Sequence, residues 1–180
     1  MMRARLGAGV LACVVGTSSM LAGGGEIRVT PVVAEHQVAA SFAAPAAFTE
    51  DAHAVVQSGL LLTFTFVVEL RRPSGLWWDR TVSAVTVGST AKFDNLTGVY
   101  QISKLQDGHV TWSDRTADLT EARTWMTTFD RVPLAAEKQL EPNGDYYIHV
   151  RMRASPRRTF SLWPWTGDDS AGRADFTNIR

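Results

Sequence analysis

The sequence predicts a mainly β domain, an antiparallel β-sandwich or strongly bent sheet with two helices packed against it. Two segments carry this prediction, because apolar and polar side chains alternate along them with the period of a half-buried strand. In the first, every even position from 60 to 70 is apolar, whereas Thr63, Thr65 and Glu69 occupy odd positions. In the second, the even positions from 146 to 152 are Tyr, Ile, Val and Met, and Arg151 and Arg153 occupy odd positions. Each segment should therefore place one face on a core and the other in solvent.

Turn residues and weaker alternation extend the sheet. Asn143-Gly144, just before the second strong segment, predicts a tight hairpin, and Asp107-Gly108 predicts a turn after a weaker strand at Val99–Leu105. Six weaker strands are predicted, at Ile27–Val33, His36–Phe42, Val82–Phe93, Val99–Leu105, Val132–Ala136 and Arg173–Ile179.

Two helices interrupt the strands. Thr49 is typical of a helix N-cap, so a short helix is predicted from Glu50 to Ser58, ended by Gly59. The second is predicted from an apolar stripe with the spacing of three to four residues, and we expect Trp125 and Phe129 to pack it against the sheet. The stripe consists of Leu119, Ala122, Trp125, Met126 and Phe129.

The N-terminus predicts export. Arg3 and Arg5 precede an apolar run from Leu6 to Gly16, and small residues follow at 22 to 25, as in a cleaved signal peptide. We therefore interpret residues 1–25 as a signal peptide and residues 26–180 as a single β-rich domain. The protein is then expected in the periplasm or elsewhere outside the cytoplasm.

Two other interpretations of this leader remain open. An uncleaved membrane anchor would tether the protein, but a spanning helix needs about 20 apolar residues and this run is shorter. A lipoprotein signal would acylate Cys13, although few apolar residues precede that cysteine. Cys13 is the chain's single cysteine, so a chain cut after residue 22 would hold no disulfide.

Composition excludes several classes of protein. The chain is 45% hydrophobic and 20% charged, which is typical of a folded domain and not of a disordered one. Its 18 basic and 18 acidic side chains give no net charge. A neutral chain has no overall field to attract nucleic acid, so we expect no nucleic-acid partner.

Several short blocks, taken in their order along the chain, resemble a known family. They are Ser58-Gly59-Leu60, Val68-Glu69-Leu70-Arg71-Arg72, Trp77-Trp78-Asp79, Phe93-Asp94-Asn95-Leu96-Thr97 and Tyr100. In them the chain resembles the bacterial domain-of-unknown-function family number 4390. The resemblance implies an exported or membrane-tethered envelope protein with no assigned activity. It also implies an accessory role beside a membrane protein such as a sensor kinase, and it supplies no catalytic residue.

The search for chemistry leads to the same expectation. The common hydrolase, zinc and nucleotide motifs are absent from the sequence, so we expect no enzyme, no cofactor and no metal. Asp79 and Asp94 are the candidates for a catalytic carboxylate pair. Capping, or pairing with Arg71 or a neighbouring arginine, is the competing use of these two side chains. We therefore expect a non-catalytic interaction or accessory module.

Tryptophans in segments without strand or helix periodicity give the alternative function. They are Trp77, Trp78, Trp163 and Trp165. These rings either fold back to close the ends of the core or form a shelf for a ligand, because Trp combines a large apolar surface with a polar N–H. The alternative function is therefore a binding domain for a small apolar or glycan ligand, or an enzyme of unrecognised type.

Arginines and tryptophans near the C-terminus predict a partner surface. Alternation places Arg151 and Arg153 on the outer face of their strand, and a loop beyond Pro156 would bring further cations beside aromatic rings. Such a surface suits an acidic partner or anionic lipid head groups. Pairing with acids on a neighbouring strand is the competing interpretation. The predicted surface comprises Arg151, Arg153, Arg157, Arg158, Trp163 and Trp165, with Trp77 and Trp78 as a second candidate.

Overall fold

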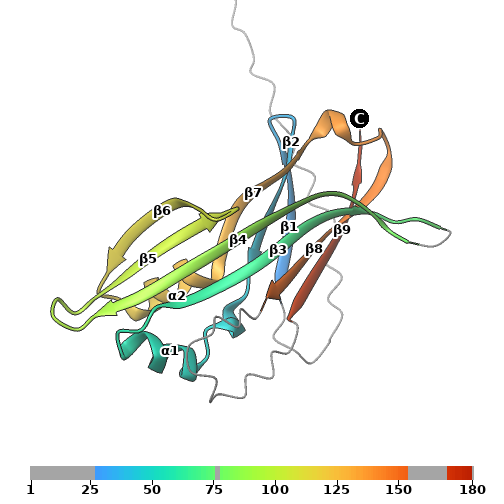
Figure 1. Ribbon diagram of the computed structural model, residues 1–180. Coiled ribbons are helices and arrows are strands. Elements are labelled where there is room, and N and C mark those ends of the chain that lie inside the picture. Colours follow the sequence, from blue (N-terminus) through green and yellow to red (C-terminus); the bar gives the residue numbers. More distant parts are fainter. Residues whose placement is uncertain (1–26, 76–77, 154–169, 180) are drawn as a thin grey trace, which may run out of the picture.

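The computed structural model describes residues 27–75, 78–153 and 170–179, which form two antiparallel sheets and two α-helices (Figure 1). The small sheet has the order β1-β2-β7, with β1 Arg28–Ala34, β2 Gln37–Ala43 and β7 Thr128–Ala136. The large sheet has the order β6-β5-β4-β3-β8-β9, with β6 His109–Thr116, β5 Val99–Gln106, β4 Arg80–Asp94, β3 Leu62–Arg72, β8 Gly144–Arg153 and β9 Ala171–Asn178. The sheets pack together without closing into a barrel, so the predicted mainly β fold with two helices is confirmed. The predicted signal peptide lies outside the described residues.

The core lies on one face of the large sheet, called here its inner face. The even residues of β3 from Phe64 to Leu70 are each at most 5% exposed, and Ile148 and Val150 of β8 are fully buried. The pairing of Val68 with Val150 and of Leu70 with Ile148 keeps both rows on that face. The alternation in the sequence is thus confirmed, because one face of each strand is excluded from water.

Three phenylalanines join the two sheets. Phe42 of β2 stacks on Phe129 of β7 at 4.8 Å, and Phe66 of β3 meets both rings edge-on at 5.3 and 5.4 Å. Edge-to-face and stacked pairs add to the stabilisation that burial of the rings provides. The small sheet is therefore fixed against the inner face of β3.

The helices cover the part of the inner face that the small sheet leaves open. α1 (Glu50–Gln57) is capped as predicted, with the Thr49 hydroxyl accepting from the Ala52 amide at 3.2 Å. α2 (Leu119–Thr127) buries Met126, but β7 follows directly, so the prediction that Phe129 belongs to the helix is wrong. Phe129 keeps its place in the core as a strand residue. Neither helix, nor any other among the described residues, is long and apolar enough to cross a bilayer.

Turns and edge strands account for two further corrections. Asp107-Gly108 forms the tight turn of the β5–β6 hairpin as predicted, with both residues at positive φ. Asn143-Gly144 also turns the chain, but the predicted hairpin is wrong because β7 and β8 belong to different sheets. The strand β6 was not predicted at all, because it is an edge strand with mostly exposed side chains and so lacks apolar alternation.

Side chains of the large sheet also reach the backbone that runs from α2 into β7. Ser89 Oγ donates to the Met126 carbonyl at 2.6 Å, and Ser83 Oγ donates to the Leu134 carbonyl at 2.6 Å. Lys104 Nζ donates to the Thr128 carbonyl at 2.7 Å. Buried carbonyls without a donor are costly, so these bonds stabilise the contact between the sheets.

Candidate functional site

The outer face of the large sheet gathers polar side chains over β3, β8 and β9. Antiparallel register sets Arg71 opposite Tyr147, Tyr147 opposite Asp175, and His149 between Glu69 and Arg173. Residues directly opposite one another lie on the same face with their Cβ atoms about 5 Å apart. We call this surface the arginine face; it comprises Glu69, Arg71, Tyr147, His149, Arg151, Arg153, Arg173 and Asp175.

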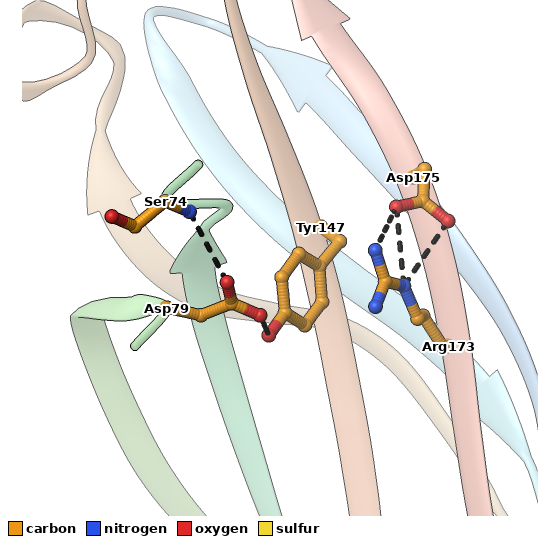
Figure 2. Close-up of polar contacts among 5 residues, drawn as sticks. All are labelled: Ser74, Asp79, Tyr147, Arg173 and Asp175. Carbon is orange, nitrogen blue, oxygen red and sulfur yellow. Dashed lines mark hydrogen bonds and ion pairs between the residues drawn. The ribbon is translucent and has the colours of Figure 1, made fainter. Parts of the chain in front are cut away.

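Tyr147 lies at the centre of the arginine face, because its position in β8 alternates with residues that point into the core. It is only 3% exposed, because the Arg173 guanidinium lies 3.8 Å from the ring centroid and that of Arg71 lies 5.8 Å away. Figure 2 shows its hydroxyl donating to Asp79 Oδ2 at 2.5 Å, while the Ser74 amide donates to Asp79 Oδ1 at 3.1 Å. Cations over an aromatic face are attracted by its electron density. The ring is therefore held between two cations and a carboxylate.

These contacts fix the charge states around Tyr147. Burial and the bond to Asp79 raise the pKa of Tyr147 above its usual value, so the phenol stays protonated at neutral pH. The bonds from Tyr147 and Ser74 lower the pKa of Asp79, so that carboxylate stays ionised. The phenol is therefore a hydrogen-bond donor in this arrangement, and Asp79 accepts.

A hollow of about 300 Å³ opens beside Tyr147 between Arg71, His149 and Arg173. Arg173 binds Asp175 through Nε and Nη2, the closest contact being 2.6 Å, and Figure 2 shows this fork. Arg71 donates from Nη2 to the Asp79 carbonyl at 3.2 Å, but its buried Nε has no hydrogen-bond partner among the described residues. This edge of the hollow therefore lacks an acceptor for the Arg71 Nε. A buried donor without an acceptor is costly.

Beside the hollow, a histidine and an arginine on this face share one carboxylate. Arg151 Nη2 donates to Glu69 Oε1 at 3.2 Å, and His149 Nδ1 lies 3.7 Å from Glu69 Oε2. Burial and the nearby Arg151 charge lower the pKa of His149. The imidazole is therefore neutral at pH 7, and the positive charge here comes from arginines.

Some of the predicted site residues take part in this face. Arg151 and Arg153 are exposed on it as alternation predicted, and Arg151 pairs with Glu69, as the competing interpretation proposed. Trp78 is 85% exposed, so the expectation that its ring folds back on the core is wrong. The other predicted members, Trp77, Arg157, Arg158, Trp163 and Trp165, lie outside the described residues.

Asp79 and Asp94 do not form the catalytic pair considered from the sequence. Asp79 directly precedes β4 and Asp94 is its last residue, so they lie at opposite ends of a 15-residue strand that rises about 3.3 Å per residue. Asp94 accepts from the amides of Leu96 and Thr97 and so closes its own turn. Asp79 is engaged by Tyr147 and Ser74. The two carboxylates therefore lie far apart, and each one has structural hydrogen bonds of its own.

Sequence analysis did not single out Arg71, Tyr147 or Arg173 as members of one site. Alternation places each of them on the outer face of its own strand, but it does not say which strands are neighbours. The pairing of β3 with β8 and of β8 with β9 brings them together. The part of the chain that the structure describes holds no group of three or more metal-ligating acids, histidines or cysteines.

This arrangement suits recognition of negative charge by hydrogen bonds. Guanidinium groups bind carboxylates and phosphates through paired N–H donors, and two of them, those of Arg71 and Arg173, lie 5.8 and 3.8 Å from the Tyr147 ring centroid. No curated protein and no solved structure matches the chain. One family model, described as a domain of unknown function (DUF4390), matches residues 26–158, from just before β1 to beyond β8. Because this match covers most of the chain, the protein belongs to the DUF4390 family.

Proposed function

We propose that this protein is an exported, non-catalytic interaction module of the cell envelope. In this proposal its arginine face binds an acidic segment of another envelope protein. The observation that carries the proposal is the convergence of Arg71 and Arg173 on Tyr147 beside an open hollow, with Arg151 and Arg153 exposed on the same face. Fixed arginines on a rigid sheet lose little conformational freedom when they bind a partner.

The charges on this face support an acidic partner. Each acid of the face already has an intramolecular hydrogen bond, whereas the buried Nε of Arg71 has none and the Arg151 side chain is half exposed. A carboxylate of a partner would pair with the exposed guanidinium of Arg151. Charge complementarity of this kind raises association rates and selects among partners.

Export is supported by the N-terminal sequence and by the extent of the family match. The match begins at residue 26, where the predicted signal peptide ends. An exported protein would meet its partners in the envelope, and the family resemblance favours a membrane protein such as a sensor kinase as the partner. The same module would work whether its leader is cleaved or keeps it at the membrane.

The binding proposal is tested with a defined acidic probe and matched charge reversals. Binding of a hexaglutamate peptide should weaken by about tenfold or more in the double variant Arg151→Glu/Arg153→Glu, and should weaken in the parent as salt rises. Titration calorimetry gives both affinities. Arg115→Glu on β6 is the control, because it makes the same charge change at an exposed position away from this face.

Three outcomes would contradict the binding proposal. The first is an equal loss of affinity in the Arg115 control, and the second is unchanged affinity in the double reversal. The third is binding to vesicles containing anionic lipid but not to the peptide, which would favour a membrane surface as the partner. Circular dichroism of each variant establishes that the fold is intact before affinities are compared.

Location has a separate test that does not depend on the partner. Cell fractionation should place the protein outside the cytoplasm, and the intact mass should show an N-terminus created by cleavage near residues 22 to 25. A cytoplasmic product beginning at Met1 would contradict export. A lipid-modified Cys13 would instead favour the lipoprotein interpretation.

A further inference from the structure

A second hollow lies on the other side of the large sheet, between its inner face and β7. Its volume is about 290 Å³, and β4, β5, β6 and β7 all contribute to its lining. Apolar side chains form much of the wall, notably Trp112 of β6 and Phe129 of β7. Trp112 is held in place by Trp125 of α2, whose ring meets it edge-on at 5.0 Å. We call this hollow the inter-sheet groove.

Lys104 of β5 lies in the wall of the groove at a position where the fold normally places an apolar residue. Along β5 the two preceding inner-face residues, Tyr100 and Ile102, are buried in the core. Lys104 continues that row, and its Nζ lies 5.1 Å from the Phe129 ring centroid and 5.7 Å from that of Trp112. The ammonium group therefore lies beside two aromatic rings.

The hydrogen bonding of Lys104 is incomplete. Its Nζ donates to the Thr128 carbonyl at 2.7 Å, and Lys104 belongs to no ion pair among the described residues. Burial lowers the pKa of Lys104, and Asp130 only partly opposes that effect. Asp130 itself accepts a hydrogen bond from the Ser41 hydroxyl at 2.6 Å. A half-buried cation without a carboxylate contact is unusual, because buried charges are normally paired.

A bulge in β7 shapes the same groove. The register with β2 shifts opposite Ser41, and Arg131 there adopts a left-handed φ of 47°. The Arg131 amide donates to Ser41 Oγ at 3.0 Å, which ties the bulge to β2. Left-handed backbone is uncommon for a non-glycine residue, and bulges of this kind often occur beside functional sites. The bulge places a second cation, Arg131, in the lining of the groove, together with Asp130, whose Oδ1 is already engaged by the Ser41 hydroxyl.

We propose that the inter-sheet groove binds a small amphipathic carboxylate, with its anionic group on Lys104 and its apolar body between Trp112 and Phe129. The ligand would give the ammonium the ion pair that the protein itself does not provide. An open groove of this volume has room for about ten water-sized groups, at about 30 Å³ each, so an eight-carbon fatty acid is a suitable probe. The site lies on the opposite face from the arginine face, so the proposal is independent of the proposed function.

The proposal is tested with two probes that differ in charge and little in shape. Octanoate should bind the parent protein at least about tenfold more tightly than octanamide, because a hydrogen bond to a charged group is worth that factor or more. Lys104→Met should abolish this preference while keeping the length and apolar stem of the side chain. Lys92→Met is the matched control, since Lys92 is an exposed lysine on β4. Titration calorimetry reports the affinities.

A second measurement needs no change at Lys104, in case the variant fails to fold. Octanoate should raise the pKa of Lys104 in the parent protein, read from its ¹³Cε chemical shift, because a bound anion stabilises the ammonium form. Thr111→Trp, in the lining of the groove, should weaken octanoate binding by filling the groove; it keeps the Lys104 ammonium, although it removes the hydrogen bond from the Thr111 hydroxyl to the Lys104 carbonyl. Equal affinity for octanoate and octanamide would overturn the proposal. Absence of octanoate binding at millimolar concentration, or an unchanged Lys104 pKa when it is bound, would also overturn it.

Discussion

His149 and Glu69 lie opposite each other on β8 and β3, and the balance of charges around them makes the arginine face sensitive to acid. Burial lowers the pKa of His149, the charges of Arg151 and Arg71 add to that effect, and the Glu69 carboxylate opposes it. Arg173 lies opposite His149 on β9 and is itself paired with Asp175. The neutral imidazole is thus the form that the folded protein favours.

Acid should therefore destabilise the protein through His149. Below a pH of about 6.5 the unfolded chain takes up a proton that the folded His149 does not, so the free energy of unfolding falls as pH decreases. The loss should begin near pH 6.5 and level off below the lowered pKa of the folded state. Denaturant unfolding of the parent and of His149→Gln between pH 7.5 and about 5.5 measures it.

The variant should show the smaller decrease in stability over this range. His109→Gln is the control, because it makes the same substitution at an exposed position on β6. If His149→Gln and the parent have the same pH dependence, the imidazole is not held neutral by its surroundings.

At the scale of one element, α2 depends on the residue just before it. Asp118 Oδ1 accepts from the Thr120 amide at 2.7 Å, and the helix runs directly into β7 without a loop. A capped first turn therefore fixes the position of Met126, which packs in the core, and of the strand that follows. The cap therefore contributes to the position of β7 as well as to the stability of the nine-residue helix α2.

Removing that cap should lower stability by a predictable amount. Asp118→Ala should reduce the free energy of unfolding by about 1 kcal/mol, because the Thr120 amide loses its acceptor. Thermal and denaturant unfolding provide the measurement. Asp118→Asn keeps a side-chain oxygen at the same position and should cost only a fraction of that; equal losses in both variants would contradict the capping role.

How far each element could be predicted depends on how much of its signal is local. β3 and β8 were predicted because one face of each is buried, and alternation records burial directly. β6 has no buried face, so its sequence carries no such period, and Phe129 fitted a helical stripe although it lies in a strand. Arg151 and Arg153 were placed on the outer face by alternation alone. Their neighbours Arg71 and Arg173 required the strand order, which is set by contacts distant in the sequence.

For the molecule as a whole, the crossing of β1 over β9 joins the small sheet to the far edge of the large one. A Cβ at Gly172 would lie 2.2 Å from the Ile27 carbonyl oxygen and 2.8 Å from a Val29 methyl carbon. No real Cβ is found so close to backbone. Glycine is therefore required at this point by the close approach of the two strands.

Gly172→Ala should force β1 away from β9 and destabilise the protein by about 3 kcal/mol, the upper range for overpacked sites. Its melting temperature should fall accordingly. Gly75→Ala is the control, since a Cβ there meets nothing within 4 Å and should change stability little. Similar melting temperatures for the two variants would show that the crossing tolerates a side chain.

The same crossing has a consequence for when the protein can fold. β1 begins at residue 28 and needs β9, which begins at residue 171, while the partners in the β3–β8 pair, from Thr65 with Arg153 to Arg71 with Tyr147, are 88 to 76 residues apart in the sequence. Contacts between such distant segments form only after the intervening chain is available, and they form slowly. A nascent chain therefore cannot bring β1 against β9 before residues 171–178 have left the ribosome. A chain in which this contact is still missing is incompletely folded, and incomplete folding is compatible with the export proposed above.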